Sequence, residues 1–475
     1  MEYIIKPFDN IINLEKYKVE KSTIDSEETY YKDKSRFEET HIKIIHPPLY
    51  LTIKENETLF QNEGEIIQSY KHLTSTKRIE INNKSKIEKV TFIKSWVYDE
   101  NIRRRENITF TPPPTIAPNN AYNTWRDFQF LNTYIDIDET KKEEYIIRFT
   151  EYIDNLLGNR EEYTNYFISW VANIIQTPAN RSQVCIILYS IDEGSGKSLI
   201  CELISKLIGD DKSYFITDLE NQLFGKHSLA EMNRLLIVLN EIKGKDTYLN
   251  HDKFKSRITD PKRDYEPKGL KSFNGDNFCS YIATTNNPNC VPITDKQRRF
   301  CPITCENKKI NDKIYFDNFI KDILNNVEAH KVIFDYLKSF DIEKYVPNKL
   351  FQSYIPKNDP LFENLTEYNK PIEMKFLEHY INKCDFNPAE EKILKADIFD
   401  EFKSYVRRFE EKETSTTTLR KFNLNFVEKV ANTINKTPKF KDAIQYSTDK
   451  NPIRIRNEHA YIFNRVLLRN YFNIE

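Results

Sequence analysis

Glycine is scarce in this chain and is concentrated in one region, which limits what that region can form. Nine glycines occur in 475 residues, and seven of them lie between Gly194 and Gly275. Because glycine adopts backbone conformations that other residues avoid, we expect unusual backbone geometry there. The first two of the seven follow an apolar run, 184–189, and precede leucine and isoleucine residues at helical spacing, 199–207. Strand, glycine-containing loop and helix, in this order, are typical of a loop that wraps a phosphate group.

The loop at 190–198 reads S-I-D-E-G-S-G-K-S and predicts a nucleotide site. Its glycines let backbone N–H groups turn toward phosphate oxygens, while Lys197 is expected to neutralise the β- and γ-phosphates and the Ser198 hydroxyl to hold Mg²⁺. The common pattern G-x4-G-K-[ST] has a glycine where this chain has Ile191, so a chance match in a surface loop is the alternative. The flanking strand and helix favour the nucleotide site. The residues expected to bind ATP are Glu193, Gly194, Ser195, Gly196, Lys197, Ser198 and Leu199.

A second apolar run, 235–239, ends in Asn240 and Glu241. A carboxylate at the end of a neighbouring strand lies beside the loop phosphates, where it can orient the attacking water or hold Mg²⁺ through water. Two acidic residues are usual at this point. Since Asn240 adds no charge, Glu241 is expected to carry the site alone. The residues expected to bind the metal are Ser198, Asn240 and Glu241.

A third apolar run, 281–285, is followed by Asn286 and, twelve residues later, by Arg298 and Arg299. An amide at a strand end can contact the γ-phosphate, and an arginine from a neighbouring subunit can neutralise charge as that phosphate departs. By themselves, a strand-ending turn and a solvated arginine pair are the alternatives. Their order behind two stronger motifs favours catalysis. The residues expected to be catalytic are Lys197, Glu241, Asn286 and Arg299.

Together these motifs resemble those of the superfamily 3 helicases, especially the primase-helicases of poxviruses and other large DNA viruses, phages and plasmids. The matching stretches are G-S-G-K-S at 194–198, L-N-E at 239–241, Y-E-P-K-G-L-K at 265–271, T-T-N at 284–286 and R-R-F at 298–300. The resemblance implies an α/β P-loop ATPase core, AAA+-like, in which helices flank a parallel sheet.

The resemblance also implies a mode of action. It implies an ATP- and Mg²⁺-dependent hexameric ring, with one nucleotide at each subunit interface and 3′-to-5′ travel on single-stranded DNA. A β-hairpin of each subunit is expected to line the channel. By position, Lys268 and Lys271 match its tip and Arg299 matches the arginine finger. A turn at Asn274-Gly275 is a rival that places both lysines on a strand.

The sequence predicts four regions. The expected regions are an N-terminal α+β region of unknown role at 1–115, a helical segment at 116–180, the ATPase core at 181–345 and a winged-helix-like module at 346–475. The last is expected to bind DNA or to dock another protein. There Arg454 and Arg456 alternate with isoleucines, so a strand places both guanidinium groups on one face, toward DNA phosphates or toward solvent.

Composition limits the partners and the location. Net charge is −1, so a nucleic-acid surface must be a local patch. Expected partners are single-stranded and forked DNA, further copies in a hexamer, and a primase or polymerase on another chain. No apolar run approaches the roughly 18 residues of a membrane span, and the first residues lack signal-peptide features. We therefore expect a protein of the cytoplasm or of host replication sites. The alternative functions are an ATPase that loads or remodels replication proteins and an origin-binding initiator.

Overall fold

The computed structural model describes residues 28–54, 58–81, 84–226, 228–266, 272–294, 296–306, 308–383, 389–409, 418–450 and 457–474. The chain forms two compact units, Met1–Leu365 and Thr366–Glu475. The first unit extends past the boundary expected at 345 because Phe351, Ile355 and Leu361 are buried in its hydrophobic clusters.

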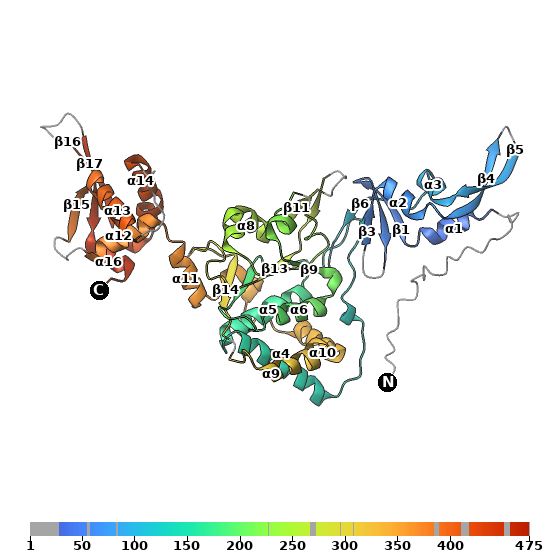
Figure 1. Cartoon of the computed structure of the whole chain (residues 1–475), viewed down its shortest axis with the longest axis horizontal. Coiled ribbons are helices and arrows are strands. Elements are labelled where there is room, and N and C mark those ends of the chain that lie inside the picture. The colour runs from blue at the N-terminus through green and yellow to red at the C-terminus, as the bar shows by residue number, and fades with distance from the viewer. Residues whose placement is uncertain are drawn as a thin grey trace. The chain divides into compact units, whose positions relative to one another are not determined.

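The N-terminal part of the first unit contains both helices and strands (Figure 1). Five of its strands form a sheet in the order β3-β2-β1-β6-β7, and β4 and β5 form a separate antiparallel hairpin. A cluster of aromatic side chains around the fully buried Trp96 forms its core. The elements are α1 (Tyr30–Phe37), β1 (His41–His46), β2 (Leu49–Ile53), β3 (Thr58–Gln61), α2 (Glu63–Tyr70), β4 (Thr74–Ile81), β5 (Lys84–Thr91), α3 (Phe92–Val97), β6 (Arg104–Thr109) and β7 (Ala121–Asn123).

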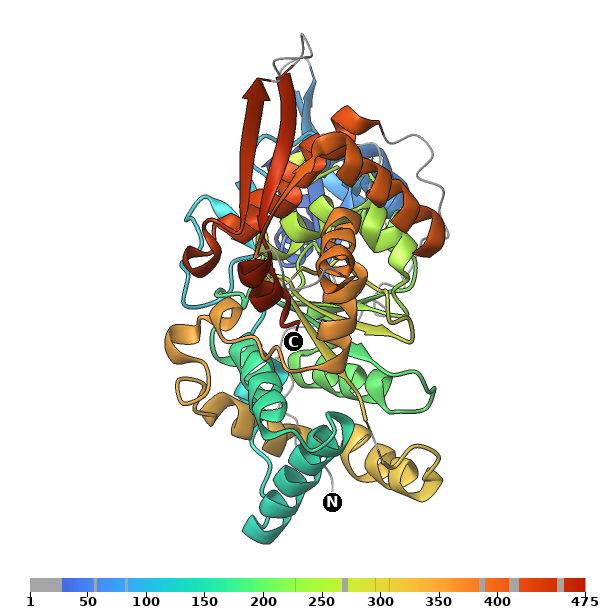
Figure 2. The ribbon, with the colours of Figure 1, turned by 90° about the vertical axis from the view of Figure 1, so that its left-hand side faces the viewer.

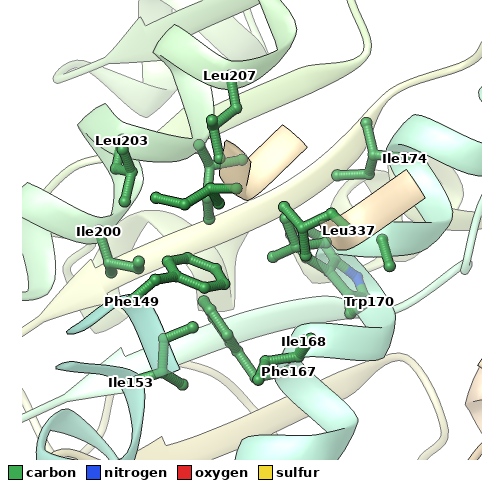
Figure 3. Close-up of a cluster of buried hydrophobic side chains, with 14 of the residues drawn as sticks. Phe149, Ile153, Phe167, Ile168, Trp170, Ile174, Ile200, Leu203, Leu207 and Leu337 are labelled. Atoms are coloured by element: carbon green, nitrogen blue, oxygen red, sulfur yellow. The ribbon is translucent and has the colours of Figure 1, made fainter. Parts of the chain in front are cut away.

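Two long helices, α4 (Glu139–Leu156) and α5 (Glu161–Gln176), follow a short 3-10 turn, η2 (Gln129–Leu131). The Asp138 carboxylate caps α4 by accepting a hydrogen bond from the Thr140 amide (3.1 Å). Most of α5 is buried, and the Trp170 indole N–H donates to the Val184 carbonyl (3.1 Å) just before the central sheet. Side chains of both helices meet those of α6 (Lys197–Ile208) and α10 (Val327–Ser339) in one apolar cluster (Figure 3). The helical segment and the sheet therefore share one core.

The central sheet confirms the predicted parallel arrangement flanked by helices. Its order is β14-β8-β13-β10-β9, and every neighbouring pair is parallel. Alternate residues of the strands belong to two clusters: one contains α4, α5, α6 and α10 side chains, and the other contains α8 side chains. The strands are β8 (Cys185–Tyr189), β9 (Ser213–Ile216), β10 (Leu236–Leu239), β13 (Ser280–Thr285) and β14 (Phe300–Thr304).

The connections of this sheet carry the remaining elements of the first unit. A two-stranded antiparallel hairpin, β11 (Lys262–Tyr265) with β12 (Phe273–Asp276), stands between α8 and β13. The other elements are α6 (Lys197–Ile208), η3 (Asp210–Lys212), η4 (Leu219–Leu223), α7 (Gly244–Leu249), α8 (His251–Thr259), α9 (Lys313–Phe319), η5 (Ile320–Leu324), α10 (Val327–Ser339), η6 (Pro347–Lys349) and η7 (Phe351–Ser353), and α11 (Pro360–Tyr368) crosses into the second unit.

The second unit packs helices against a three-stranded antiparallel sheet in the order β15-β17-β16. β16 and β17 run side by side in both views of the chain (Figures 1 and 2). Phe376, Phe402, Phe422 and Phe426 lie in its core. The elements are α12 (Ile372–Lys383), β15 (Glu390–Leu394), α13 (Lys395–Phe409), α14 (Leu419–Asn425), η8 (Phe426–Ala431), α15 (Asn432–Asn435), η9 (Pro438–Phe440), β16 (Ile444–Lys450), β17 (Asn457–Asn464) and α16 (Arg465–Phe472).

Candidate functional site

The loop between β8 and α6 requires glycine at two points. Gly194 and Gly196 have φ of 74° and 94°, in the left-handed region that favours glycine. The Tyr152 hydroxyl of α4 donates a hydrogen bond to the Gly196 carbonyl (2.8 Å), and a Cβ atom at Gly196 would collide with that hydroxyl. The second glycine is therefore fixed both by backbone conformation and by contact with α4.

Lys197 begins α6 and brings the first and third motifs together. Its ammonium group donates to the Ser190 hydroxyl, to the Ser195 hydroxyl (3.2 Å) and to the Asn286 amide oxygen (2.9 Å). Asn286 follows β13, the strand that pairs with β8. Lys197 is only 8% exposed, and burial lowers the pKa of its ammonium group. The three groups that accept its hydrogen bonds are neutral, so an anionic ligand would compensate the buried charge more fully.

The outer side of the loop faces solvent. Glu193, Gly194 and Ser198 are exposed and Leu199 is half-buried, so the Ser198 hydroxyl at the start of α6 is open to a ligand. Ile191, the departure from the common pattern, is 78% exposed and is not among the positive-φ residues of the chain. A side chain is therefore tolerated at this position because its backbone does not require glycine.

The turn after β10 is joined to β13 by backbone and threonine hydrogen bonds. The Glu241 amide donates to the Thr284 hydroxyl (3.2 Å), the Ile242 amide donates to the Thr284 carbonyl (3.0 Å) and the Thr285 hydroxyl donates to the Ile242 carbonyl (2.8 Å). Glu241 has φ of 53° and an exposed side chain. Burial has the largest effect on the pKa of Lys197 and lowers it, while the charges of Asp192, Glu193 and, least of these, Glu241 raise it. Lys197, Asn286 and Glu241 thus share the edge at which the parallel strands end.

Asn240 contributes mainly through its backbone. Its amide donates to the Ile216 carbonyl (2.8 Å) at the end of β9, and its side chain is half-buried. The side chains of Ser198, Asn240 and Glu241 carry oxygen atoms, the ligands that Mg²⁺ prefers. The donor chemistry of this edge therefore fits a magnesium-bound nucleotide.

Arg299 lies at the opposite end of the parallel strands, where they begin. Its carbonyl accepts from the Cys185 amide (2.8 Å) at the start of β8, and β14 then runs parallel to β8. A five-residue strand spans roughly 16 Å, at about 3.3 Å per residue, so Arg299 is not brought together with the phosphate loop of its own chain. The Gln297 side-chain oxygen accepts from the Arg299 amide (2.7 Å). Among the described atoms, the buried Arg299 Nε has no hydrogen-bond partner, and Arg298 is exposed.

Four residues expected to contact DNA lie outside the described residues: Lys268, Lys271, Arg454 and Arg456. The strands beside the first two are described, and Tyr265 pairs with Phe273 while Arg263 pairs with Gly275. Asn274 and Gly275 therefore belong to β12, and the rival turn at these two residues is wrong. The expected hairpin with its connection at 266–272 remains.

Tyr152 is the contact that sequence reasoning missed. It stacks on Phe319 of α9 with ring centroids 3.7 Å apart and reaches the loop through its hydroxyl. It lies 44 residues before Gly196, in a helix whose pattern shows only an apolar face. No local signal in the sequence distinguishes it from its apolar neighbours.

Comparison with known proteins places the chain beside a phage replication protein. Residues 188–299 match a family described as a family of unknown function (DUF5906). The DNA primase-polymerase of Nitratiruptor phage NrS-1 is 29% identical over 210 residues, which cover 43% of this chain. The match spans only 28% of the phage protein's length.

Solved structures of the NrS-1 C-terminal region share the fold. The apo structure of its residues 305–718 has a TM-score of 0.58 at 17% identity and covers 92% of this chain and all of that chain. An A-form apo structure of the same region has a TM-score of 0.59 at 16% identity, covering 89% and 96%. The likeness in fold therefore extends beyond residues 188–299 to most of the chain.

In the described parts of the chain, no helix combines the length and the apolar character that crossing a bilayer requires.

Proposed function

We propose that this chain is an ATP-dependent DNA helicase of the superfamily 3 type that acts as a ring, with hexameric assembly, in replication of a phage or similar genome. The separation of Arg299 from the phosphate loop carries the proposal. Lys197, Asn286 and Glu241 lie where the parallel strands end. The arginine that phosphoryl transfer needs lies where the strands begin. A second copy can supply it, so each active site forms between neighbouring subunits.

Within one site, the residues divide the work. Backbone N–H groups of the loop and the Lys197 ammonium group hold the β- and γ-phosphates, and Asn286 contacts the γ-phosphate beside Lys197. Glu241 orients the attacking water and accepts its proton. Ser198 and Glu241 would hold Mg²⁺, with Asn240 bonded to its water. When bound, that metal neutralises charge on the phosphates.

The relatives support a place in replication. The matched phage protein is named a DNA primase-polymerase, and its C-terminal region has the fold of this chain. We therefore propose single-stranded and forked DNA as the substrate, and a primase or polymerase on another chain as the partner. The second unit, with helices packed on a three-stranded sheet, is proposed as a winged-helix-like module that binds DNA or docks that partner.

The deciding experiment measures ATP hydrolysis with and without single-stranded DNA, on protein sized by light scattering in the presence of nucleotide. We expect Mg²⁺-dependent hydrolysis that DNA stimulates, by a species larger than one chain. A rate of hydrolysis that is the same with and without DNA would support instead an ATPase that loads or remodels replication proteins. Origin-specific duplex binding without unwinding would support an initiator.

A further inference from the structure

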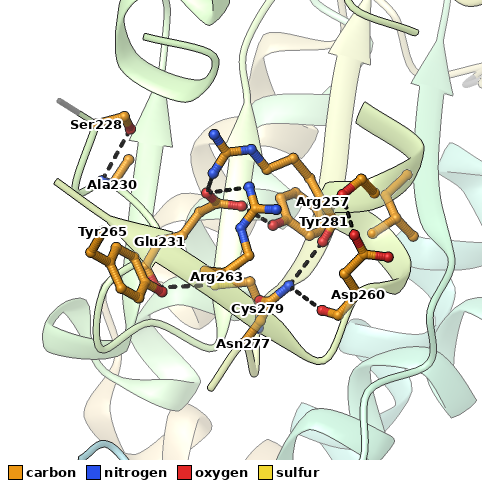
Figure 4. Close-up of polar contacts among 12 residues, drawn as sticks. Ser228, Ala230, Glu231, Arg257, Asp260, Arg263, Tyr265, Asn277, Cys279 and Tyr281 are labelled. Atoms are coloured by element: carbon orange, nitrogen blue, oxygen red, sulfur yellow. Dashed lines mark hydrogen bonds and ion pairs between the residues drawn. The ribbon is translucent and has the colours of Figure 1, made fainter. Parts of the chain in front are cut away.

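A buried carboxylate away from the phosphate loop joins three elements of the first unit (Figure 4). The Glu231 side chain is 1% exposed and lies in the turn before β10. It accepts hydrogen bonds from Arg257 of α8, from Arg263 of β11 (3.4 Å) and from the Tyr281 hydroxyl of β13. One acidic group thus fixes a helix, the hairpin and the sheet to one another.

At the base of the hairpin, the buried side chains of β11 contact Glu231. β11 has two buried residues, Arg263 and Tyr265, which alternate with exposed ones. Arg263 bonds the Glu231 carboxylate, and the Tyr265 hydroxyl donates to the Glu231 carbonyl (3.4 Å). On the other side, the exposed Lys262 pairs with Asp276 across the hairpin (3.0 Å). Both inward side chains of this strand therefore end on one residue.

The opposite side of the cluster reaches the strand that leads to the nucleotide site. Tyr281 is buried in β13, and burial raises the pKa of its hydroxyl, which therefore stays protonated and donates to Glu231. β13 is paired on both sides, with β8 and with β10. Four residues beyond Tyr281 the strand ends at Thr285, and the next residue, Asn286, accepts from Lys197. Tyr281 is thus joined to the Asn286 and Lys197 pair by a short strand that is paired on both sides.

We propose that Glu231 is a positioning residue that couples the β11–β12 hairpin to the Asn286 and Lys197 pair, so that DNA held by the hairpin alters ATP hydrolysis. This inference rests on the proposed helicase function. Its physical basis is one contiguous set of directional bonds from Arg263 through Glu231 and Tyr281. A contribution to folding stability is a weak explanation for this buried cluster, because apolar residues of similar volume can often replace a buried ion pair without loss of stability.

The test uses the full chain with Tyr281→Phe, Arg263→Met and the double variant. ATP hydrolysis is measured with and without a single-stranded oligothymidylate. We expect basal hydrolysis within about twofold of the parent and DNA stimulation reduced by roughly fivefold or more, the lower end of measured couplings between sites. Because the two bonds act in series, the double variant should lose no more stimulation than the worse single variant.

Tyr30→Phe is the matched control. Tyr30 is also fully buried, and its hydroxyl donates to a carboxylate, that of Asp99 (2.6 Å), which also pairs with the Lys34 ammonium group (2.9 Å). It lies in the N-terminal part of the unit, outside the path from hairpin to Asn286. This variant should lose thermal stability to an extent similar to that of Tyr281→Phe and should keep full DNA stimulation.

The possible outcomes separate this inference from the proposed function. A parent chain that DNA does not stimulate removes the helicase proposal. A stimulated parent, with Tyr281→Phe stimulated equally, overturns the coupling role of Glu231 and leaves the helicase intact. If Arg263→Met does not fold, Tyr281→Phe decides alone, since it removes one hydroxyl and keeps the ring. Loss of stimulation in Tyr30→Phe as well would also overturn the coupling role.

Discussion

At the scale of the residue, the proposed function assigns ATP binding mainly to Lys197 and activation of the attacking water to Glu241. Lys197 donates to Asn286 and is buried, whereas Glu241 is exposed at a strand end. Lys197→Ala removes the cation of the loop and should abolish both hydrolysis and most ATP affinity. Glu241→Gln keeps the shape but cannot accept the proton of the attacking water.

We therefore expect Glu241→Gln to bind ATP normally and to hydrolyse it at least roughly 10²-fold more slowly than the parent. Fluorescent-nucleotide binding and single-turnover hydrolysis measure the two effects. Glu220→Gln, at an exposed carboxylate in η4, is the control and should behave as the parent. Normal hydrolysis by Glu241→Gln means that another carboxylate activates the water.

Gly196 gives a second prediction at this scale. Gly196→Ala places a side chain at φ of 94° and against the Tyr152 hydroxyl. The left-handed conformation alone should cost about 1–2 kcal/mol, and the collision adds to it. Thermal unfolding and ATP binding measure the loss. Tyr152→Phe removes the colliding hydroxyl, so the double variant should recover part of the loss. A double variant with no recovery would show that the collision with the hydroxyl is not the main part of the effect.

At the scale of the element, the sequence predicted whichever features depend on local pattern. The runs at 184–189 and 281–285 became strands of the parallel sheet because strongly apolar segments of this length bury on both faces of such a sheet. The expected helices at 199–207 and in the C-terminal part formed because their apolar residues recur at helical spacing.

What depends on distant contacts could not be predicted. Strand order decides that β13 lies between β8 and β10, and nothing in either apolar run records its neighbour. The Tyr152 contact with Gly196 and the Glu231 cluster join residues far apart in the sequence. Their side chains have the same local patterns as ordinary buried residues, so their partners emerge only in the folded chain.

The hairpin carries the prediction at this scale. Lys268→Ala with Lys271→Ala, in the connection between β11 and β12, should keep basal ATP hydrolysis and lose DNA stimulation and unwinding together. The reason is that lysine contacts to phosphates dominate DNA affinity. Lys262→Ala removes an exposed lysine at the base of the same hairpin and is the control. Normal unwinding by the tip variant would place the DNA-contacting loop elsewhere.

At the scale of the whole molecule, the proposed ring would make each chain contribute to two sites, with its phosphate loop in one and its Arg299 in the next. Arg299→Ala should leave ATP binding by one chain largely intact and slow hydrolysis by roughly 10³-fold, the scale of an arginine finger. Mixed with Lys197→Ala chains, it should regain activity, because one kind of interface then has both an intact loop and an intact arginine. Steady-state hydrolysis across mixing ratios measures this.

Arg298→Ala, at the exposed neighbour, is the comparison for that experiment. If it is silent, the arginine role belongs to Arg299. No activity at any mixing ratio would favour an arginine that acts within its own chain, although the sheet separates it from the loop.

The threonine bonds between the turn at Glu241 and β13 have a consequence for solvent exchange. The amide hydrogens of Glu241 and Ile242 lie in a turn, where exchange with water is ordinarily fast. Here each is held by Thr284, through its hydroxyl and its carbonyl. Exchange at both positions then requires the turn to detach from the strand. Deuterium uptake at these two amides should therefore be as slow as in the strand itself, and should report how often this turn detaches from β13.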